Sequence, residues 1–597
     1  MHFDDEFFYT EEETAKPKIK AKKIIQFLLP YFIKYRGRII LGGFLLLLAT
    51  GLSIFGPLFL RYAIDVNIKN GNIIGLVRTA LFYLLLSLFI FLISYCQRIQ
   101  LAIIGERATA DIKDNLFAHI LNLPLSFFDK TPTGKLLTRI ESDTEALKNL
   151  FTTTGAVLMT DFVMLLGMSI IMWLVNYRLC LLVLVLIPVF SYAFHWFQKR
   201  ARPVYVDVRR KVAEINNFIN EALIGLSVVQ AFNQERHFTK RGDALNYEKY
   251  ERELRGMRLW YRVWFLVDFG EVLSLTLVLG FGSFWALRGS LTIGTLFLFF
   301  SYIQRLFGPL RGLSDQLNII QRALASGERI VEILSLKPEY LSEEGVSRYE
   351  PRCAPTAISF QDVSFGYDSS SLILKDINLL IRKGEKVALV GETGGGKTSL
   401  VSLLLRFYEP VSGTIAIDNY LSAKTPLRLW RNFFGFVPQD IILFPGSVLD
   451  NLRLFDYKIS TERVERATQR LGIHERILNF PDGYQTNLIE RGINLSVGER
   501  QLLSFARALI FDPPVLILDE ATSSVDPQTE SLLQAGLQEL LKERTAIIIA
   551  HRLATIQMCD RIIVIHKGRI VEEGTHQELL EKKGFYYKLY KLQFVAI

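Results

Sequence analysis

The chain has 597 residues, of which 50% are hydrophobic and 22% are charged, and its formal net charge is +9. This length allows several domains, and so many apolar residues beside an ordinary share of charged ones predict separate membrane and soluble parts. The basic clusters at 199–202 and 209–211 flank apolar runs, as at the cytoplasmic ends of membrane helices, which argues against a nucleic-acid-binding protein. The four cysteines are scattered without a CxxC pair, so we expect neither a disulfide framework nor a zinc site.

The N-terminal segment is acidic and lacks a basic stretch followed by an apolar run, so it does not read as a signal peptide. We expect residues 1–23 to form a cytoplasmic tail, acidic and then basic, and the first spanning helix to act as the insertion signal. The apolar segment 24–36 has basic ends and is too short to span. It predicts an interfacial helix on the cytoplasmic leaflet.

Six segments have the roughly 20 mostly apolar residues that a spanning helix needs. They are about 38–60, 78–100, 157–176, 179–197, 263–287 and 293–312. Spans two and three, and spans four and five, are separated by about 55 to 65 charged residues with helical patterning, whereas the other connections are short. The basic character of the long connectors places them and both termini in the cytoplasm, so we expect helices that continue well beyond the bilayer.

Two acids, Asp268 and Glu271, lie within the fifth span, three residues apart and therefore on one helix face. Ionisable groups at membrane depth are costly, which favours a functional role. They are predicted either to line a transport cavity that favours cationic or amphipathic substrates, or to pair with Arg262 or Arg305 or lie beyond the hydrocarbon. Asp161 in the third span is expected to be interfacial.

The pattern changes to short β-rich runs after a polar stretch at 335–355. The segment 391–398 reads Gly-Glu-Thr-Gly-Gly-Gly-Lys-Thr, follows a predicted strand at 386–390 and opens a predicted helix. This is the context of a phosphate-binding P-loop, whose backbone N–H groups and helix N-terminus face phosphate oxygens. Lys397 is expected to reach the β- and γ-phosphates, and Thr398 to offer its hydroxyl to Mg²⁺.

About 120 residues later, an apolar strand ends in Asp519 and Glu520. A buried strand that carries Asp519 to its tip can hold the water shell of a metal. The adjacent Glu520 is then placed to polarise the attacking water.

With these two motifs in order, the chain resembles the ATP-binding cassette (ABC) exporters, and specifically half-transporters with a fused membrane domain, from about residue 24 onward. The resemblance implies an α-helical polytopic membrane domain with six spans of the exporter type, followed by an α/β P-loop ATPase domain. The predicted boundaries are a tail at 1–23, a transmembrane domain at 24–330, a linker at 331–354 and a nucleotide-binding domain at 355–597.

The resemblance also assigns roles to individual residues. Tyr367 matches the aromatic residue that stacks on adenine, Gln439 the glutamine that senses Mg²⁺, and His551 the histidine that contacts the γ-phosphate. Asp526 matches the loop that communicates between the two ATPase domains. Residues 490–492 match a loop that touches the coupling helices. The segments 126–129 and 220–235 resemble the first and second coupling helices. ATP contacts are implied for Tyr367, Gly391, Thr393, Gly394, Gly395, Gly396, Lys397, Thr398, Ser399, Ser496, Gly498 and Asp526, catalysis for Glu520, His551 and Gln439, and Mg²⁺ binding for Thr398, Gln439 and Asp519.

One motif departs from the family pattern, because LSGGQ is replaced by Leu-Ser-Val-Gly-Glu at 495–499. In the family this segment of one chain closes over ATP held by the other, and Ser496 and Gly498 still fit that role. Val497 adds bulk where glycine allows close approach, and Glu499 brings a carboxylate near a polyanion, which is unfavourable unless screened. We expect a heterodimer whose partner carries the intact signature. The alternative is a homodimer in which the LSVGE sequence is a tolerated variant of the signature.

The resulting hypothesis is an exporter of the bacterial cytoplasmic membrane that works by alternating access and takes drugs, lipids or peptides. The nearest alternative is a homodimeric lipid flippase of the same fold. An ATP-gated channel or scaffold is a different class, which the intact Glu520 and His551 disfavour. A mechanical ATPase would need a coiled coil, and importers usually keep their membrane and ATPase parts on separate chains.

Overall fold

The computed structural model describes residues 21–339, 356–368, 371–519, 527–550 and 552–592. Its contacts divide the chain into a helical unit, Met1–Leu123 with Thr131–Pro338, and an α/β unit, Pro124–Lys130 with Glu339–Ile597. Most of the predicted tail and linker lies outside the described residues, and the predicted domain boundaries stay predictions.

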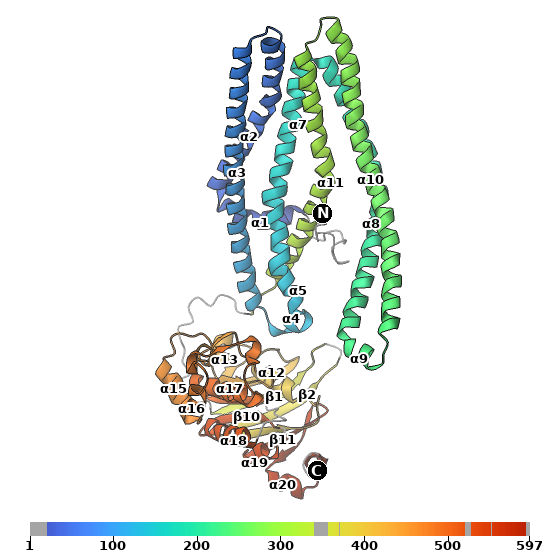
Figure 1. The fold of residues 1–597 in the computed structure, drawn as a ribbon. Helices are drawn as coiled ribbons and strands as arrows, with labels where there is room; N and C mark the ends of the chain where they lie inside the picture. Colours follow the sequence, from blue (N-terminus) through green and yellow to red (C-terminus); the bar gives the residue numbers. More distant parts are fainter. Residues whose placement is uncertain (1–20, 340–355, 369–370, 520–526, 551, 593–597) are drawn as a thin grey trace. The chain divides into compact units, whose positions relative to one another are not determined.

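The helical unit is built around long α-helices (Figure 1), together with short α-helices and short π-helical turns. Its helices are α1 (Ala21–Ile33), α2 (Arg36–Tyr62), α3 (Ile73–Leu121), α5 (Thr133–Thr138), α6 (Thr144–Asn149), α7 (Gly155–Val175), α8 (Tyr177–Ile224), α9 (Leu226–Ala231), α10 (Glu235–Leu287) and α11 (Ile293–Ser335), and its π-helical turns are η2 (Ala63–Ile68), η3 (Arg139–Asp143) and η4 (Leu150–Thr154).

Each of the six predicted spans falls in one long helix, in the order α2, α3, α7, α8, α10 and α11. Four stretches of the described residues are long and apolar enough to cross a membrane, namely Arg36–Ile68, Ile73–Leu121, Thr133–Val175 and Glu235–Leu287. Helix α3 has 49 residues and α10 has 53, which at 1.5 Å per residue is about 70–80 Å. This exceeds the roughly 30 Å of bilayer hydrocarbon and confirms that the helices continue beyond it.

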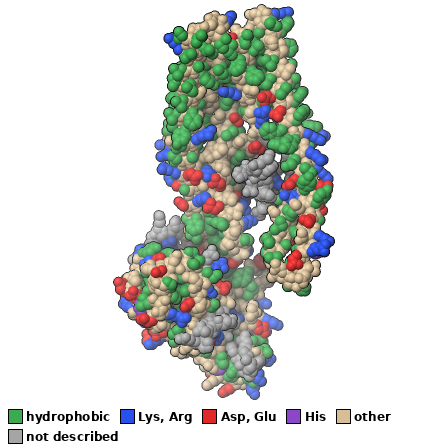
Figure 2. All heavy atoms as spheres, viewed as in Figure 1, with side chains coloured by type: hydrophobic (Ala, Val, Ile, Leu, Met, Phe, Trp, Pro, Cys, Tyr) green, Lys and Arg blue, Asp and Glu red, His purple; other side chains and the backbone are tan. Residues whose placement is uncertain are grey.

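The long helices run in pairs, α2 with α3 and α8 with α10 (Figure 1). Figure 2 shows hydrophobic side chains predominating over the upper part of the helical unit and charged side chains gathering over its lower part. A buried cluster from several of these helices includes Met168, Phe299 and Tyr302. The Tyr302 hydroxyl donates to the Ile54 carbonyl oxygen at 2.7 Å, so the phenol's polar atom is satisfied inside the apolar cluster.

Helix α1 corresponds to the predicted interfacial helix at 24–36 but packs on protein along one face. Ile24, Leu28 and Phe32 recur every fourth residue, so they share a face, and all three are buried where α1 contacts α3 and α11. Leu29 and Ile33 are exposed. One apolar stripe of the helix therefore serves the protein core, and Leu29 and Ile33 are left for the surroundings.

The α/β unit contains α4 (Leu125–Lys130), which covers the predicted first coupling segment, and the C-terminal half of the chain. Its strands are β1 (Ala357–Phe365), β2 (Leu374–Arg382), β3 (Lys386–Val390), β4 (Ser412–Ile417), β5 (Tyr420–Leu421), β6 (Phe434–Val437), β7 (Gly446–Ser447), β8 (Asn487–Leu488), β9 (Val515–Asp519), β10 (Thr545–Ile549), β11 (Arg561–His566) and β12 (Arg569–Gly574). Its further helices are α12 (Lys397–Leu404), α13 (Leu427–Arg431), α14 (Val448–Leu452), α15 (Thr461–Arg470), α16 (His474–Leu478), η5 (Gly483–Gln485), η6 (Glu490–Gly492), α17 (Val497–Phe511), α18 (Pro527–Leu541), α19 (Leu553–Gln557), α20 (His576–Glu581) and α21 (Phe585–Tyr590).

Two main sheets organise this unit. A sheet of order β2-β1-β4-β5 pairs antiparallel, and a larger sheet has the order β12-β11-β3-β10-β9-β6. In the larger sheet β11, β3, β10, β9 and β6 are parallel, and only β12 is antiparallel. The central strands are continuous apolar runs because both of their faces are buried, which is typical of a parallel sheet covered by helices.

Candidate nucleotide site

The predicted site residues gather because four parallel strands end at the same edge of the larger sheet. Strand β3 ends at Val390, directly before the P-loop, and β9 ends at Asp519, which is in register with Ile549 at the end of β10. Strand β6 ends two residues before Gln439. Ligands of open α/β sheets bind at the carboxyl edge of the strands, so this edge is the candidate site.

The P-loop between β3 and α12 is a tight turn that needs glycine. Gly394 and Gly396 have φ values of +80° and +106°, a region that other residues rarely adopt. A Cβ atom on Gly391 would lie 2.2 Å from the carbonyl oxygen of Ile565 on β11, so that position has no room for a side chain. Thr393 and Gly394 are exposed on the turn, whereas Gly395 is buried beneath it.

Lys397 begins α12 and its side chain folds back over the loop. Its Nζ donates to the carbonyl oxygens of Gly391, at 2.8 Å, and Glu392, at 3.0 Å. Burial lowers the pKa of this ammonium group, and the negative charge of Asp519 opposes that shift. The lysine is thus held at the loop, close enough to Asp519 for their charges to interact. Thr398 next to it is exposed.

Asp519 and Gln439 approach each other across a small cavity of about 40 Å³. Val497 and Gln501 of α17 line the same cavity. The Gln501 side chain is buried, and its Oε1 has no hydrogen-bond partner among the described residues. The cavity wall is mostly apolar, but Gln439, Asp519 and Thr555 also line it. A cavity of this size can hold a water molecule, which would satisfy the Gln501 oxygen. Sequence reasoning missed Gln501.

Tyr367 lies beside the helix that follows the P-loop. Its hydroxyl is 3.3 Å from the Oγ atom of Ser399, and its ring makes edge-to-face contacts with Phe365 and Tyr408 at centroid distances of 5.0 and 4.9 Å. The side chain remains 45% exposed. Two aromatic neighbours therefore fix the ring, and its exposed part is available to stack on a planar ligand.

The signature segment 495–499 forms the N-terminus of α17. Ser496 is the N-cap residue, and it forms a capping box with Glu499, whose Oε2 accepts from the Ser496 backbone N–H at 2.9 Å. Glu499 also accepts from Arg476 Nε on α16 at 3.2 Å. The carboxylate, which was expected to be unfavourable unless screened, is paired with a cation of the same chain. Val497 is 45% exposed, and Gly498 is buried.

Three predicted site residues, Glu520, Asp526 and His551, lie outside the described residues. In the sequence, Glu520 directly follows Asp519, the last residue of β9, and His551 lies two residues after Ile549, the last residue of β10.

The acids of the fifth span pair with an arginine that sequence reasoning did not name. Arg311 Nη2 on α11 donates to Asp268 Oδ1 at 2.9 Å and to Glu271 Oε2 at 2.5 Å. Arg305, one of the two expected partners, donates instead to the Ser53 carbonyl oxygen. The expected ion pair is therefore present with a different partner. The Asp268 side chain is 55% exposed and that of Glu271 is 15% exposed.

A P-loop at the edge of a parallel sheet, fused to a bundle of long apolar helices, defines a membrane-bound P-loop ATPase. Comparison with known proteins makes the class specific. Residues 39–310 match the family model described as the ABC transporter transmembrane region, and residues 374–523 match the family model described as ABC transporter.

Relatives of known organism match over most of their length. An uncharacterised ABC transporter ATP-binding protein of Bacillus subtilis is 34% identical, covering 99% of this chain and 98% of its own. The ATP-dependent lipid A-core flippase of Syntrophus aciditrophicus is 35% identical over 84% and 83%. A Staphylococcus aureus protein proposed to be a multidrug export ATP-binding/permease protein is 34% identical over 96% and 99%.

Among solved structures, a bacterial Atm1-family ABC exporter with ATP bound superposes with a TM-score of 0.76 at 25% identity, covering 94% of this chain and 98% of that one. The chain therefore belongs to the ABC transporter family, as an exporter half with fused membrane and ATPase domains. It binds and hydrolyses ATP to drive export, and it acts as a dimer in the bacterial inner membrane with its ATPase domain in the cytoplasm.

Proposed function

We propose that this chain is one subunit of a heterodimeric exporter for hydrophobic or amphipathic compounds, with its ATP-binding residues at the carboxyl edge of the large sheet. The convergence of the P-loop, Asp519 and Gln439 at that edge carries the proposal. Two ATP molecules held between facing ATPase domains pull them together. The coupling segments, which include α4 and α9, transmit the closure to the long helices and reopen the transport cavity outward.

In this proposal, ATP lies along the P-loop with its adenine on the exposed part of Tyr367. The backbone N–H groups of residues 391–396 and the N-terminus of α12 bind the phosphates. Lys397 exchanges its carbonyl contacts for the β- and γ-phosphates, because a phosphate oxygen is a stronger acceptor than a neutral carbonyl. Ser399 supports the Tyr367 hydroxyl.

Mg²⁺ fits the oxygen donors at this edge. Thr398 offers an exposed hydroxyl, Gln439 an exposed amide oxygen and Asp519 a carboxylate, and Mg²⁺ favours a few such hard ligands together with nucleotide phosphates. The ion would neutralise developing charge on the transferred phosphoryl group. Among the protein groups, Asp519 would orient the water shell of the metal and Gln439 would sense its presence.

Glu520 is the proposed base that polarises the attacking water, and His551 contacts the γ-phosphate from the end of β10. Asp526 communicates with the partner's ATPase domain. Because phosphoryl transfer is mostly positioning and charge stabilisation, Glu520→Gln should trap ATP with little loss of binding. Trapped nucleotide is measured as labelled ATP retained by the protein in liposomes. Normal turnover in that variant would rule out Glu520 as the base.

The charged group in the membrane helices supports a substrate preference. Asp268, Glu271 and Arg311 together carry one excess negative charge, and Asp268 is the exposed acid. We infer that it favours cationic amphipathic compounds over anionic ones. The test is ATPase stimulation in liposomes across cationic, neutral and anionic drugs, lipids and peptides, with Asp268→Asn as the variant. Loss of stimulation by cationic compounds alone supports the inference, and an unchanged profile contradicts it.

A transport assay separates an exporter from an ATP-gated channel or scaffold. An ATP-gated channel or scaffold would bind ATP without accumulating substrate inside inverted vesicles, whereas an exporter accumulates it only while ATP is hydrolysed.

The unequal dimer is proposed from the signature segment, because Val497 and Glu499 depart from the family pattern while the catalytic residues are intact. One observation favours the homodimeric alternative, a lipid flippase of the same fold. The pairing of Glu499 with Arg476 reduces the penalty of an acidic signature. Purification of the natively expressed chain decides between them: a second half-transporter in stoichiometric amount supports the heterodimer, and a fully active homodimer with two equivalent hydrolytic sites excludes it.

A further inference from the structure

The signature segment is tied to Arg476 through a short chain of hydrogen bonds. Helix α17 begins at Val497 with Ser496 as its N-cap, and the Ser496 Oγ accepts the Glu499 backbone N–H at 3.2 Å. Glu499 Oε2 in turn accepts the Ser496 backbone N–H at 2.9 Å, while Glu499 Oε1 accepts from Arg476 Nε at 3.2 Å. Arg476 comes from α16, a separate helix 23 residues earlier in the chain.

The Ser496 hydroxyl has one proton, and this proton is donated to Glu499. The Ser496 Oγ lies 2.9 Å from Glu499 Oε2, and because Oγ already accepts from the Glu499 N–H, the carboxylate is the acceptor of its own O–H. A hydrogen bond to a charged carboxylate is stronger than one to a neutral amide. The serine must give up this bond before it can donate to a phosphate oxygen of ATP.

Glu499 is charged under ordinary conditions. Burial raises the pKa of its carboxyl, but the hydrogen bonds from the Ser496 backbone and side chain and from Arg476 outweigh burial and leave the pKa below its usual value. An approaching polyphosphate therefore meets a carboxylate next to the serine that should bind it. The Arg476 guanidinium is the only cation that the described residues pair with this carboxylate, and it offsets that charge.

We propose that Arg476 is a positioning residue for ATP: it acts through Glu499 and makes this acidic signature segment able to close over nucleotide. By partly neutralising the carboxylate, Arg476 weakens the hydrogen bond that Glu499 accepts from the Ser496 hydroxyl. It also reduces the repulsion between Glu499 and the phosphates. Both effects favour the binding of ATP by Ser496. The inference rests on the proposed role of Ser496 in binding ATP across the dimer and applies whether the partner is a second copy or a different chain.

The test is a double-mutant cycle on the full chain in lipid nanodiscs, together with any partner subunit that co-purifies. All variants carry Glu520→Gln so that occlusion is measured without hydrolysis, and the readout is the ATP concentration that half-saturates occlusion. Arg476→Gln should raise that concentration about fivefold, the scale of a partly exposed charge pair. Glu499→Gln should lower it by a similar factor. In the Glu499→Gln background, Arg476→Gln should have less than about a twofold effect, because Arg476 then has no carboxylate through which to act.

A matched control pair lies elsewhere in the α/β unit. Arg470 Nη2 on α15 donates to Glu539 Oε1 on α18 at 2.9 Å, a similar pair that includes no residue of the signature segment. Arg470→Gln and Glu539→Gln should leave the half-saturating ATP concentration unchanged. Thermal unfolding of every variant separates loss of fold from loss of nucleotide affinity, and an Arg476→Lys variant should restore part of the affinity if charge is what matters.

The outcomes distinguish this inference from the proposed function beneath it. Equal effects of Arg476→Gln with and without Glu499 would overturn the inference, as would an Arg476→Gln variant that has a lower unfolding temperature but an unchanged ATP affinity. Ser496→Ala reports on the proposed function itself: if it does not weaken occlusion, the signature serine does not bind ATP and both ideas fail. If Ser496→Ala weakens occlusion but the cycle is additive, only the role of Arg476 is wrong.

Discussion

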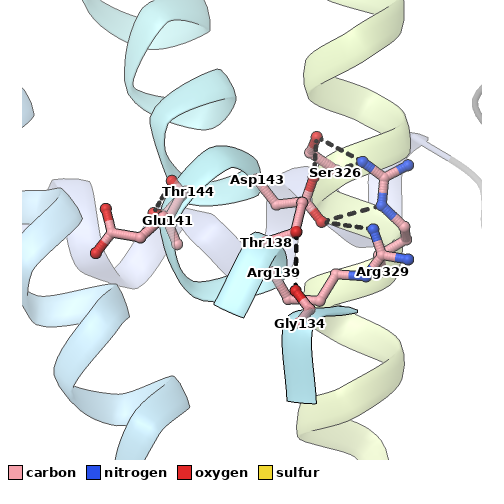
Figure 3. Close-up of polar contacts among 8 residues, drawn as sticks. All are labelled: Gly134, Thr138, Arg139, Glu141, Asp143, Thr144, Ser326 and Arg329. Atoms are coloured by element: carbon pink, nitrogen blue, oxygen red, sulfur yellow. Dashed lines mark hydrogen bonds and ion pairs between the residues drawn. The ribbon is translucent and has the colours of Figure 1, made fainter. Parts of the chain in front are cut away.

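Arg329 on α11 holds both carboxylate oxygens of Asp143 on η3, with Nε to Oδ2 at 3.0 Å and Nη2 to Oδ1 at 2.5 Å (Figure 3). Ser326, one turn earlier on α11, donates to Oδ1 at 2.8 Å, and Arg139 reaches Oδ2 at 3.2 Å. The Asp143 side chain is 4% exposed. This network joins the first long cytoplasmic connector to the last helix of the membrane domain.

Asp143→Asn removes the buried charge to which the Arg139 and Arg329 guanidinium groups donate. Breaking a buried ion pair by neutralising one partner typically costs about 3–5 kcal/mol, because the remaining charge stays desolvated. We therefore expect a clear drop in the unfolding temperature of the purified transporter in detergent and a loss of substrate-stimulated ATPase.

Glu141 supplies the matched control, since it lies two residues away on the same π-helical turn. It pairs with Lys113 at 2.6 Å, but its side chain is 62% exposed, so Glu141→Gln should change the unfolding temperature little. If both variants lowered the unfolding temperature equally, the buried network would not be what stabilises this turn.

Arg507 on α17 is half-buried, and its guanidinium donates to three oxygens of neutral groups: the Asn451 and Ile442 carbonyl oxygens, both at 2.7 Å, and Asn451 Oδ1 at 2.9 Å. Burial lowers its pKa to about 10, which leaves it charged at neutral pH. Arg507→Lys cannot reproduce the planar fork and should cost about 2–4 kcal/mol of unfolding free energy. Arg500→Lys on the same helix, whose contacts are 3.4 and 3.5 Å, should cost much less in the same denaturant titration.

The sequence was sufficient for elements whose signal is local. The P-loop at 391–398 lies where its spacing predicts, because glycines, lysine and the flanking strand and helix are adjacent in the chain. The six apolar segments likewise fall in six long helices, since length and hydrophobicity are properties of each segment alone.

Pairings between distant segments were not predictable in the same way. Arg311 is 40 residues from Glu271, and choosing it over Arg262 or Arg305 requires the register between α10 and α11, which is set by packing. Arg476 is 23 residues from Glu499 on a different helix, so no spacing rule links them. The departure of Glu499 from LSGGQ could have prompted a search for a nearby cation, but only the fold identifies which one.

Gly391 tests the packing of the P-loop against β11. Gly391→Ala would place a Cβ atom 2.2 Å from the Ile565 carbonyl oxygen, so either the loop or β11 must move, at a cost of about 2–3 kcal/mol. ATP should then no longer raise the unfolding temperature. Gly394→Ala has no atom within 4 Å and only the strain of φ +80°, so it should cost about 1 kcal/mol. An unchanged ATP-induced shift in Gly391→Ala would contradict the placement of nucleotide on this loop.

Glu271 and Asp268 share Arg311 but differ in exposure, so their neutral variants should differ in effect. Glu271→Gln removes the shorter and better-buried contact and should lower the unfolding temperature more than Asp268→Asn does. Asp268→Asn should instead alter which compounds stimulate the ATPase. The reverse ranking in thermal unfolding would show that the exposed acid is the one that holds α10 against α11.

Asp418 gives the ATPase domain a predictable dependence on pH. It lies in the turn between β4 and β5, and its Oδ1 accepts the backbone N–H groups of Thr356, at 2.9 Å, and Ala357, at 2.8 Å. Burial raises the pKa of this carboxyl, but the hydrogen bonds from the Thr356 side chain and from the two amides outweigh burial and lower it.

A carboxyl whose pKa is lower in the folded state binds fewer protons there than in the unfolded chain, so its contribution is present above its ordinary pKa and is lost as the pH falls through the lowered one. Asp418→Asn should therefore lower the unfolding temperature at about pH 7, and the difference from the wild type should shrink below about pH 4. Asp376, which is largely exposed and pairs with Arg569 at 3.2 Å, is the control, because Asp376→Asn should shift the temperature little at either pH. A difference for Asp418→Asn that persisted unchanged into acid would mean that the charge of the carboxylate is not what the two amides stabilise.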